Sequence, residues 1–253
     1  MIGGVLLDLA GVLYIGSTPL PGAHEAMQKL HQAKLSTRYL TNTTRSTSVA
    51  TLERLSGMGL PIAAGSLYTA PLAARRYIES QGLSPYLLVH PNLKPDFPGM
   101  GEGPHDAVLV GDAGEGFTYA HLNYAFRLLL EGAPLLAMGS NRYFKESDGF
   151  SLDVGPFVAG LEYAAGIQAK VLGKPAPEFF QAAVTDLGCE ASEVVMVGDD
   201  VAADVIGGVA AGLQGVLVQT GKYRPGDENE LGATNATVVA DVAAAIDWII
   251  AHR

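Results

Sequence analysis

Short apolar runs alternate with longer amphipathic stretches along the chain, and this alternation restricts the fold more than any other feature. It predicts strand–helix units and a parallel sheet, because parallel strands are joined by crossovers that are usually helical. In the first and last thirds, strands are expected at residues 4–8, 37–40, 67–68, 194–197 and 216–218. Helices are expected at about residues 22–34, 46–57 and 177–187, and a closing amphipathic helix is marked by Val242, Ile246, Ile249 and Ile250.

The middle of the chain has an α/β rhythm of its own. Three further strands are expected at residues 86–89, 107–110 and 135–138. The helix before the last of them has an apolar stripe at helical spacing, which core packing explains better than binding: Leu122, Phe126, Leu129 and Leu130. The simplest α/β architecture is a split core, residues 1–70 and 172–253, with a second α/β module inserted at residues 71–171. A chain of 253 residues with 48% hydrophobic residues is large and apolar enough for both.

Charge and cysteine content exclude some classes of protein. The formal net charge is −10, so a nucleic-acid binder is not expected, because phosphate backbones need a basic surface. Cys189 is the only cysteine, which excludes an intrachain disulfide and favours a reducing compartment. The first residues carry no basic segment and Asp8 interrupts them, so no signal peptide is expected. No uncharged apolar run reaches the ~18 residues of a membrane helix, and we expect a cytoplasmic protein without membrane contact.

Carboxylates stand at the ends of two expected strands. Asp8 ends the first run, and Asp199 follows residues 194–197 and a glycine. Open α/β sheets bind ligands at the carboxyl ends of their strands, and Mg²⁺ prefers oxygen ligands. Asp8 and Asp199 could therefore hold Mg²⁺. An acidic surface helix would by itself explain Asp200 and Asp204 better.

Two other segments could bind phosphate. The hydroxyl group of Thr41 and backbone N–H groups near Asn42 could grip phosphate oxygens, although Thr-Asn is also an ordinary strand-to-turn pair. Lys174 lies in a loop that Pro175 and Pro177 stiffen, which gives its ammonium group a defined position. The six histidines show no metal-ligand spacing, and no Ser-His-Asp grouping stands out.

In their order along the chain, the segments at Asp8, Thr41, Lys174 and Asp199 resemble the four motifs of the haloacid dehalogenase-like hydrolases. This resemblance implies a Rossmann-like parallel-sheet core in which Asp8 is the nucleophile and Lys174 neutralises Asp8 and the phosphate. Thr41 and Asn42 would bind phosphate. It also implies a Mg²⁺ ion held by Asp8, Asp199 and the backbone carbonyl of Ala10, with Asp204 as an orienting group.

The resemblance extends beyond the motifs. An insertion between the second and third motifs is typical of members with an α/β cap of the second type (C2, subfamily IIA), which are often dimers, so a homodimer is expected. The chain is similar to the branch that acts on pyrophosphate and on phospholysine- and phosphohistidine-type substrates. The stretches that carry this likeness are residues 112–115, 142–146, 152–157, 171–175 and 220–224. Asn141, Arg142 and Tyr143 either face the active site or form a surface turn.

Ala10 departs from the usual pattern of this family, in which an Asp two residues after the nucleophile is the general acid and base. Such a group contributes roughly 10²–10⁴ in rate. Alkoxide leaving groups would feel its loss fully, whereas pyrophosphate, acyl phosphates and protonated phosphoramidates leave more easily. We therefore expect a Mg²⁺-dependent phosphatase with an aspartyl-phosphate intermediate that favours such activated phosphoryl groups.

Three alternatives differ in function. A general phosphatase of small phosphorylated metabolites would carry the same motifs. A phosphate-binding protein impaired in catalysis would explain Ala10, although Asp8, Lys174 and Asp199 are all retained. A branch that cleaves phosphonates also has alanine at this position, but its helical cap lies between the first two motifs, where this chain has too few residues.

Overall fold

The computed structural model describes residues 1–145 and 149–253, which divide into two compact units. The larger unit contains Met1–Thr41, Val49–Tyr68 and Lys174–Arg253, and the inserted unit contains Asn42–Ser48 and Thr69–Gly173. The expected boundaries at residues 70/71 and 171/172 lie close to these divisions, and the short segment 42–48 is an addition. The stretch 142–146 ends at Glu146, which lies outside the described residues.

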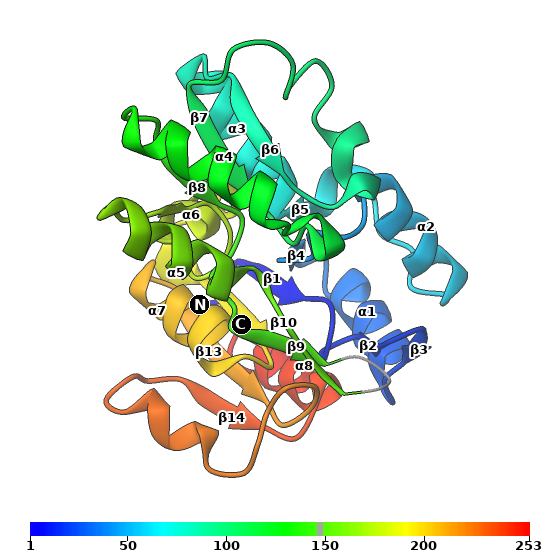
Figure 1. Cartoon of the computed structure of the whole chain (residues 1–253). Coiled ribbons are helices and arrows are strands. Elements are labelled where there is room, and N and C mark those ends of the chain that lie inside the picture. The colour runs from blue at the N-terminus through cyan, green and yellow to red at the C-terminus, as the bar shows by residue number, and fades with distance from the viewer. Residues whose placement is uncertain (146–148) are drawn as a thin grey trace. The chain divides into compact units, whose positions relative to one another are not determined.

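The larger unit is built on a six-stranded sheet with the strand order β14-β13-β12-β1-β4-β5 (Figure 1). Its strands are β1 (Gly4–Asp8), β4 (Ser36–Thr41), β5 (Leu67–Thr69), β12 (Val194–Gly198), β13 (Gln214–Val218) and β14 (Thr237–Val239). Strand β1 pairs in parallel with β12 on one side and β4 on the other. Both β1 and β12 are buried along their whole length, as expected for parallel strands covered on both faces.

Helices of the larger unit cover this sheet. They are α1 (Ala23–Gln32), α2 (Ser48–Gly57), α6 (Pro177–Leu187), α7 (Gly207–Ala210) and α8 (Val242–Ala251). Helices α1 and α8 bury Leu30, Ile246 and Ile249 against Val5 and Val197 of the sheet. The expected stripe of α8 is wrong at one position, because Ile250 is partly exposed at its edge. The short antiparallel pair β2 (Tyr14–Ile15) and β3 (Thr18–Pro19) was not expected from the sequence.

The inserted unit has its own parallel sheet, with the order β11-β8-β7-β6. These strands are β6 (Pro85–Leu88), β7 (Ala107–Val110), β8 (Leu135–Ala137) and β11 (Lys170–Val171), and a separate hairpin is formed by β9 (Tyr143–Lys145) and β10 (Phe150–Leu152). The helices are α3 (Ala70–Gln81), α4 (Tyr119–Leu130) and α5 (Val154–Ala165). The expected stripe of α4 is wrong at Leu130, which is 61% exposed, whereas Ala125, Leu128 and Leu129 are buried.

Short helices complete both units. The 3₁₀ helices are η1 (Ala64–Ser66), η2 (Pro91–Asp96), η3 (Gly114–Gly116), η4 (Ala191–Glu193) and η6 (Asp227–Leu231), and η5 (Val201–Ile206) is a π-helix.

The two parallel sheets confirm the predicted α/β class. Within residues 1–145 and 149–253, the helices lack the combination of length and apolar character that crossing a membrane requires.

Candidate active site

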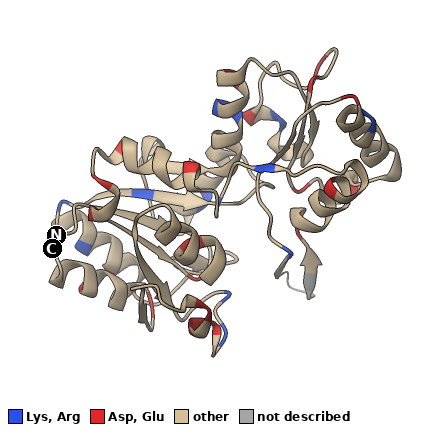
Figure 2. Cartoon of the chain, turned by 90° about the vertical axis from the view of Figure 1, so that its left-hand side faces the viewer, with Lys and Arg blue, Asp and Glu red and all other residues tan. Residues whose placement is uncertain are grey.

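Asp8 and Asp199 stand at the carboxyl ends of neighbouring strands. Asp8 is the last residue of β1, and Asp199 follows β12 directly. The parallel register pairs Leu7 with Val197, so the two aspartates lie at the same edge of the sheet. Both are buried, with exposed fractions of 6% and 2%. Charged positions lie mostly on helices and loops in Figure 2, and fully buried carboxylates are uncommon in proteins unless they are paired.

The π-helix η5 brings a third carboxylate to this edge. Asp200 begins it, because its Oδ1 atom accepts the N–H of Ala203 at 2.9 Å. Asp204 then turns back onto the strand end, where a Cβ at Gly198 would lie 2.2 Å from the Asp204 Cβ, so only glycine fits. One carboxylate oxygen from each of Asp8, Asp199 and Asp204 lies within 4.8 Å of the others. The surface-helix interpretation is therefore wrong for Asp204, which is 1% exposed.

Lys174 lies between two of these carboxylates. Its Nζ atom donates to Asp8 Oδ1 and, at 2.6 Å, to Asp204 Oδ1. Burial by itself would lower the pKa of Lys174, but the charges of Asp204 and Asp8 outweigh burial and raise the pKa. The ammonium group therefore keeps its proton, holds Asp8 by a charge-assisted hydrogen bond and is itself anchored by Asp204.

Negative charge exceeds positive charge in this cluster, since three carboxylates surround one ammonium group. Burial raises the pKa of Asp199 well above its usual value, and the charges of Asp8 and Asp204 raise it further. Burial also raises the pKa of Asp204 to about 7, against the opposing effect of Lys174. Buried carboxylates of this kind need a cation or a proton. Their oxygen-only donor set fits a hard divalent ion such as Mg²⁺.

Of the remaining predicted residues, Thr41 and Ala10 lie in the larger unit at or near this edge. Thr41 ends β4 next to Asp8, is buried, and directly follows Leu40, the register partner of Asp8. Ala10 has an exposed side chain without a titratable group, and its backbone forms a bridge with Tyr14. Asn42 belongs to the inserted unit. The structure thus brings together Asp8, Asp199, Asp204 and Lys174 and places Thr41 on the adjacent strand.

A loop after β13, residues 220–222, also contacts Asp199. From the sequence, this loop was assigned only to a stretch that resembles the family, and no role in the site was predicted for it. The backbone N–H of Lys222 donates to Asp199 Oδ2 at 2.7 Å, and Lys222 Nζ donates to Asp200 Oδ2 at 3.1 Å. Strand β13 is the neighbour of β12, so residues that follow it arrive at the same edge of the sheet. That topology was the signal that could have identified this loop.

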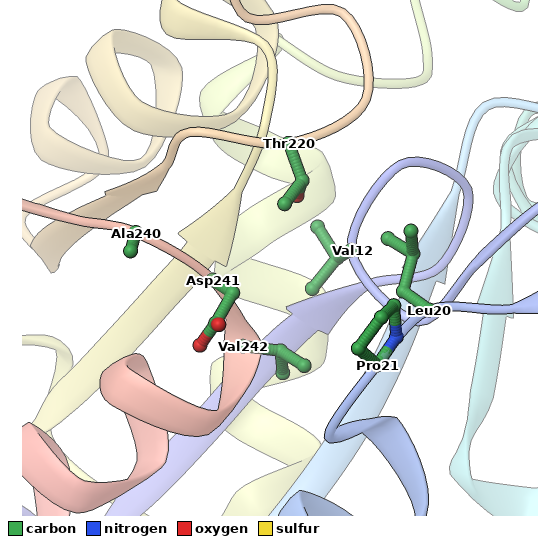
Figure 3. Close-up of a pocket in the computed structure, with 7 residues that line it drawn as sticks. All are labelled: Val12, Leu20, Pro21, Thr220, Ala240, Asp241 and Val242. Carbon is green, nitrogen blue, oxygen red and sulfur yellow. The ribbon is translucent and has the colours of Figure 1, made fainter.

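A pocket in the larger unit is lined by residues outside the carboxylate cluster (Figure 3). Its lining residues are Val12, Leu20, Pro21, Thr220, Ala240, Asp241 and Val242. The one acidic group among them, Asp241, caps α8 by accepting the N–H of Ala244 at 2.9 Å. The pocket is therefore mostly apolar, and Thr220 connects it to the loop that holds Asp199.

Comparison with known proteins agrees with this geometry. A family model described as haloacid dehalogenase-like hydrolase matches residues 5–101, and a second, HAD-hydrolase-like, model matches residues 171–245. Human haloacid dehalogenase-like hydrolase domain-containing protein 2 is 43% identical over 248 residues, covering 98% of this chain and 96% of that protein. The chain belongs to the haloacid dehalogenase-like hydrolase family. The phospholysine phosphohistidine inorganic pyrophosphate phosphatase of Danio rerio is 40% identical over 258 residues, covering 100% of this chain and 96% of that protein.

Solved structures share the fold. The p-nitrophenyl phosphatase from Archaeoglobus fulgidus superposes with a TM-score of 0.90 at 24% identity and covers 98% of this chain and 99% of its own. NagD from Escherichia coli K-12 gives a TM-score of 0.84 at 24% identity, with 96% and 97% covered. The predicted family, the Rossmann-like fold and the assignment as an enzyme of this phosphatase-containing family are confirmed.

Proposed function

We propose that this protein is a Mg²⁺-dependent phosphatase that uses Asp8 as its nucleophile. The observation that carries the proposal is the position of Asp8 at a sheet edge, held by Lys174 and facing the carboxylates of Asp199 and Asp204. Relatives with near-complete coverage and names that specify phosphatases support it.

Each group has a distinct part in the proposed reaction. A carboxylate oxygen of Asp8 attacks the phosphorus atom while the bond from phosphorus to the leaving group breaks, and water then cleaves the aspartyl phosphate to inorganic phosphate. Lys174 keeps Asp8 ionised and balances the phosphoryl charge, Thr41 donates its hydroxyl to a phosphate oxygen, and Asp204 positions Lys174. A Mg²⁺ ion bound by Asp8, Asp199 and the carbonyl group of Ala10 would supply further positive charge for the transferring group.

The residue at position 10 sets the preferred leaving group in this proposal. The methyl group of Ala10 can neither protonate a leaving group nor activate water. Pyrophosphate and protonated phosphoramidates need such help least, and the Danio rerio relative is named for substrates of these kinds. We therefore propose activated phosphoryl groups as the substrate class, with simple sugar phosphates as poor substrates.

The first test is phosphate release from pyrophosphate, phosphohistidine and a sugar phosphate in the presence and absence of Mg²⁺. Release from the first two that requires Mg²⁺ and is lost in Asp8→Asn supports the proposal. The matched control is Asp186→Asn, which removes an exposed carboxylate bound to Arg38 and should leave the rate unchanged. Binding of phosphate without release from any substrate would instead indicate a phosphate-binding protein.

Restoring the acid tests the role of Ala10 directly. Ala10→Asp should raise the rate on a sugar phosphate by about 10²–10⁴ and the rate on pyrophosphate by less. The side chain at position 10 is exposed, so aspartate should fit without repacking the core. An equal increase for both substrates would contradict the leaving-group argument.

The inserted unit is proposed to act as a C2-type cap that selects the substrate, with Asn141, Arg142 and Tyr143 as candidate contacts. Homodimer formation and a cytoplasmic location also stay predictions. Light scattering with size-exclusion chromatography tests the first of these. A change in substrate preference in Arg142→Ala, without loss of rate on the best small substrate, would support the cap assignment.

A further inference from the structure

One carboxylate oxygen of Asp199 is enclosed by backbone from two distant loops of the larger unit. The N–H of Lys222 donates to Asp199 Oδ2 at 2.7 Å. A Cβ atom at Gly11 would lie 2.0 Å from this same oxygen, and so would a Cβ atom at Gly221. Both glycines have positive φ angles, +90° and +62°. Neither position can therefore carry a side chain without displacing Asp199 or its own loop.

Thr220 joins these two loops. Its Oγ1 atom donates to the carbonyl oxygen of Gly11 at 2.5 Å, across a sequence separation of 209 residues. A Cβ at Gly221 would lie 2.5 Å from the Gly11 Cα, so the two backbones are in direct contact. Residues 220–222, named here the clasp, thus hold the Asp199 carboxylate on one side and the backbone that follows Ala10 on the other.

The clasp contacts Asp199 and Gly11, and both residues adjoin groups that would bind the cation. Asp199 provides a carboxylate, and the peptide before Gly11 provides the Ala10 carbonyl group. The N–H of Lys222 therefore restrains the Asp199 carboxylate, and the hydroxyl of Thr220 restrains the Gly11 carbonyl, one peptide beyond that of Ala10. The Gly11 N–H, which donates to the Tyr14 carbonyl at 2.8 Å, holds the Ala10–Gly11 peptide from its other side. Groups that orient metal ligands typically change metal affinity by about 10–100-fold when they are removed.

We propose that Thr220 is a positioning residue for the cation site, acting through Gly11, with the clasp fixing the rotation of the Asp199 carboxylate. The proposal rests on the proposed function, since it concerns the same Mg²⁺ site. It adds to that function a residue that is not itself a ligand. It also explains why two glycines and a small hydroxyl residue occupy positions 11, 220 and 221.

The test is Mg²⁺ titration by calorimetry of the full-length protein without substrate. Thr220→Val keeps the side-chain shape and removes the hydrogen bond, and Thr220→Ala removes it without placing a methyl group against the Gly11 carbonyl. The Mg²⁺ dissociation constant should rise about 10–100-fold, and Thr220→Ser should restore it to within about twofold of the wild-type value, because serine keeps the hydroxyl donor. Thr185→Val is the matched control, because Thr185 Oγ1 donates to the Gln181 carbonyl on an exposed helix surface at 2.9 Å.

The outcomes separate this proposal from the proposed function. An unchanged Mg²⁺ dissociation constant in Thr220→Val overturns the role of Thr220 and leaves the phosphatase proposal intact. A lower melting temperature with an unchanged dissociation constant overturns it too, because it indicates a purely structural role. Absence of Mg²⁺ binding by the wild-type protein overturns both proposals. Thr220→Ala provides the same comparison if the valine variant does not fold.

Discussion

The two units share an architecture but differ in how they balance buried charge. Each has a parallel sheet with a carboxylate at the carboxyl end of an inner strand: Asp8 as the last residue of β1 in the larger unit and Asp112 just beyond β7 in the inserted unit. Asp8 shares one ammonium group with Asp204, and Asp199 lies beside them. Asp112 forms an ion pair with the guanidinium group of Arg45.

The surroundings of Asp112 explain why it is balanced. Arg45 Nε donates to Asp112 Oδ2, and the N–H of Gly114 donates to Oδ1 at 2.9 Å. The Arg45 guanidinium also lies over the ring of Phe144, 4.5 Å from its centroid. A carboxylate at the end of a buried strand is thus not by itself a mark of catalysis. What distinguishes the larger unit is an excess of buried negative charge, which a cation or a proton must balance.

The largest expected effect comes from removing the positively charged side chain that pairs with the buried carboxylate in each unit, Lys174 or Arg45. Lys174→Met leaves buried carboxylates unpaired and should lower the free energy of unfolding by about 3–5 kcal/mol. Arg45→Met should cost less, about 1–3 kcal/mol, because Arg45 is 38% exposed and Gly114 still donates to Asp112. Fluorescence of Trp248, the single tryptophan, follows urea unfolding of the larger unit, and hydrogen exchange near Asp112 follows the inserted unit. Equal losses would remove the distinction between the two sites.

Metal binding should stabilise only the larger unit. At 100 times its dissociation constant, Mg²⁺ should stabilise the folded protein by about 2.7 kcal/mol, since it binds the folded cluster and not the unfolded chain. Asp199→Asn should abolish this gain, whereas the matched substitution Asp112→Asn should retain it. Melting temperatures with and without Mg²⁺ provide the measurement. A loss of the Mg²⁺ response in Asp112→Asn would contradict the comparison.

A smaller effect should appear in the pH dependence of the metal-free protein. Burial raises the pKa of Asp199 and, to about 7, that of Asp204, above the 3.8 of the unfolded chain. The folded state therefore binds protons more tightly, so stability falls as pH rises through this range, by up to about 1.4 kcal/mol per pH unit for one proton. The part of the loss that comes from Asp204 is complete above about pH 7. Urea unfolding between pH 5 and pH 8 measures this slope.

Saturating Mg²⁺ is the control for that prediction. The ion replaces the proton among the carboxylates, so the slope between pH 5 and pH 8 should largely disappear. Asp204→Asn should also reduce the slope, because one of the groups responsible is removed. A slope that is the same with and without Mg²⁺ would show that the titrating groups lie elsewhere.

Strand-end residues were the most predictable part of the site. Parallel strands buried on both faces need continuous apolar runs, so β1 and β12 could be located from the sequence, and with them Asp8 and Asp199. Helix α6 was equally clear, since Pro177 fits a first helical turn. Periodicity was less informative at the edges of stripes, where Leu130 and Ile250 are exposed despite their spacing.

Long-range contacts could not be predicted. The burial of Asp204 depends on a π-helix and on the missing side chain of Gly198, and neither has a periodic signal. The bond between Thr220 and Gly11 joins residues 209 positions apart. Local sequence specifies which residues reach the sheet edge, but tertiary packing decides which of them meet there.

The exposed methyl group of Ala10 has a consequence for the evolution of this enzyme. Its backbone makes the bridge to Tyr14, while its side chain takes no part in the buried core. Alanine and aspartate codons can differ by a single base. Under the proposed function, one such mutation would widen the range of leaving groups at little cost to folding, so substrate range and fold stability can be selected independently at this position.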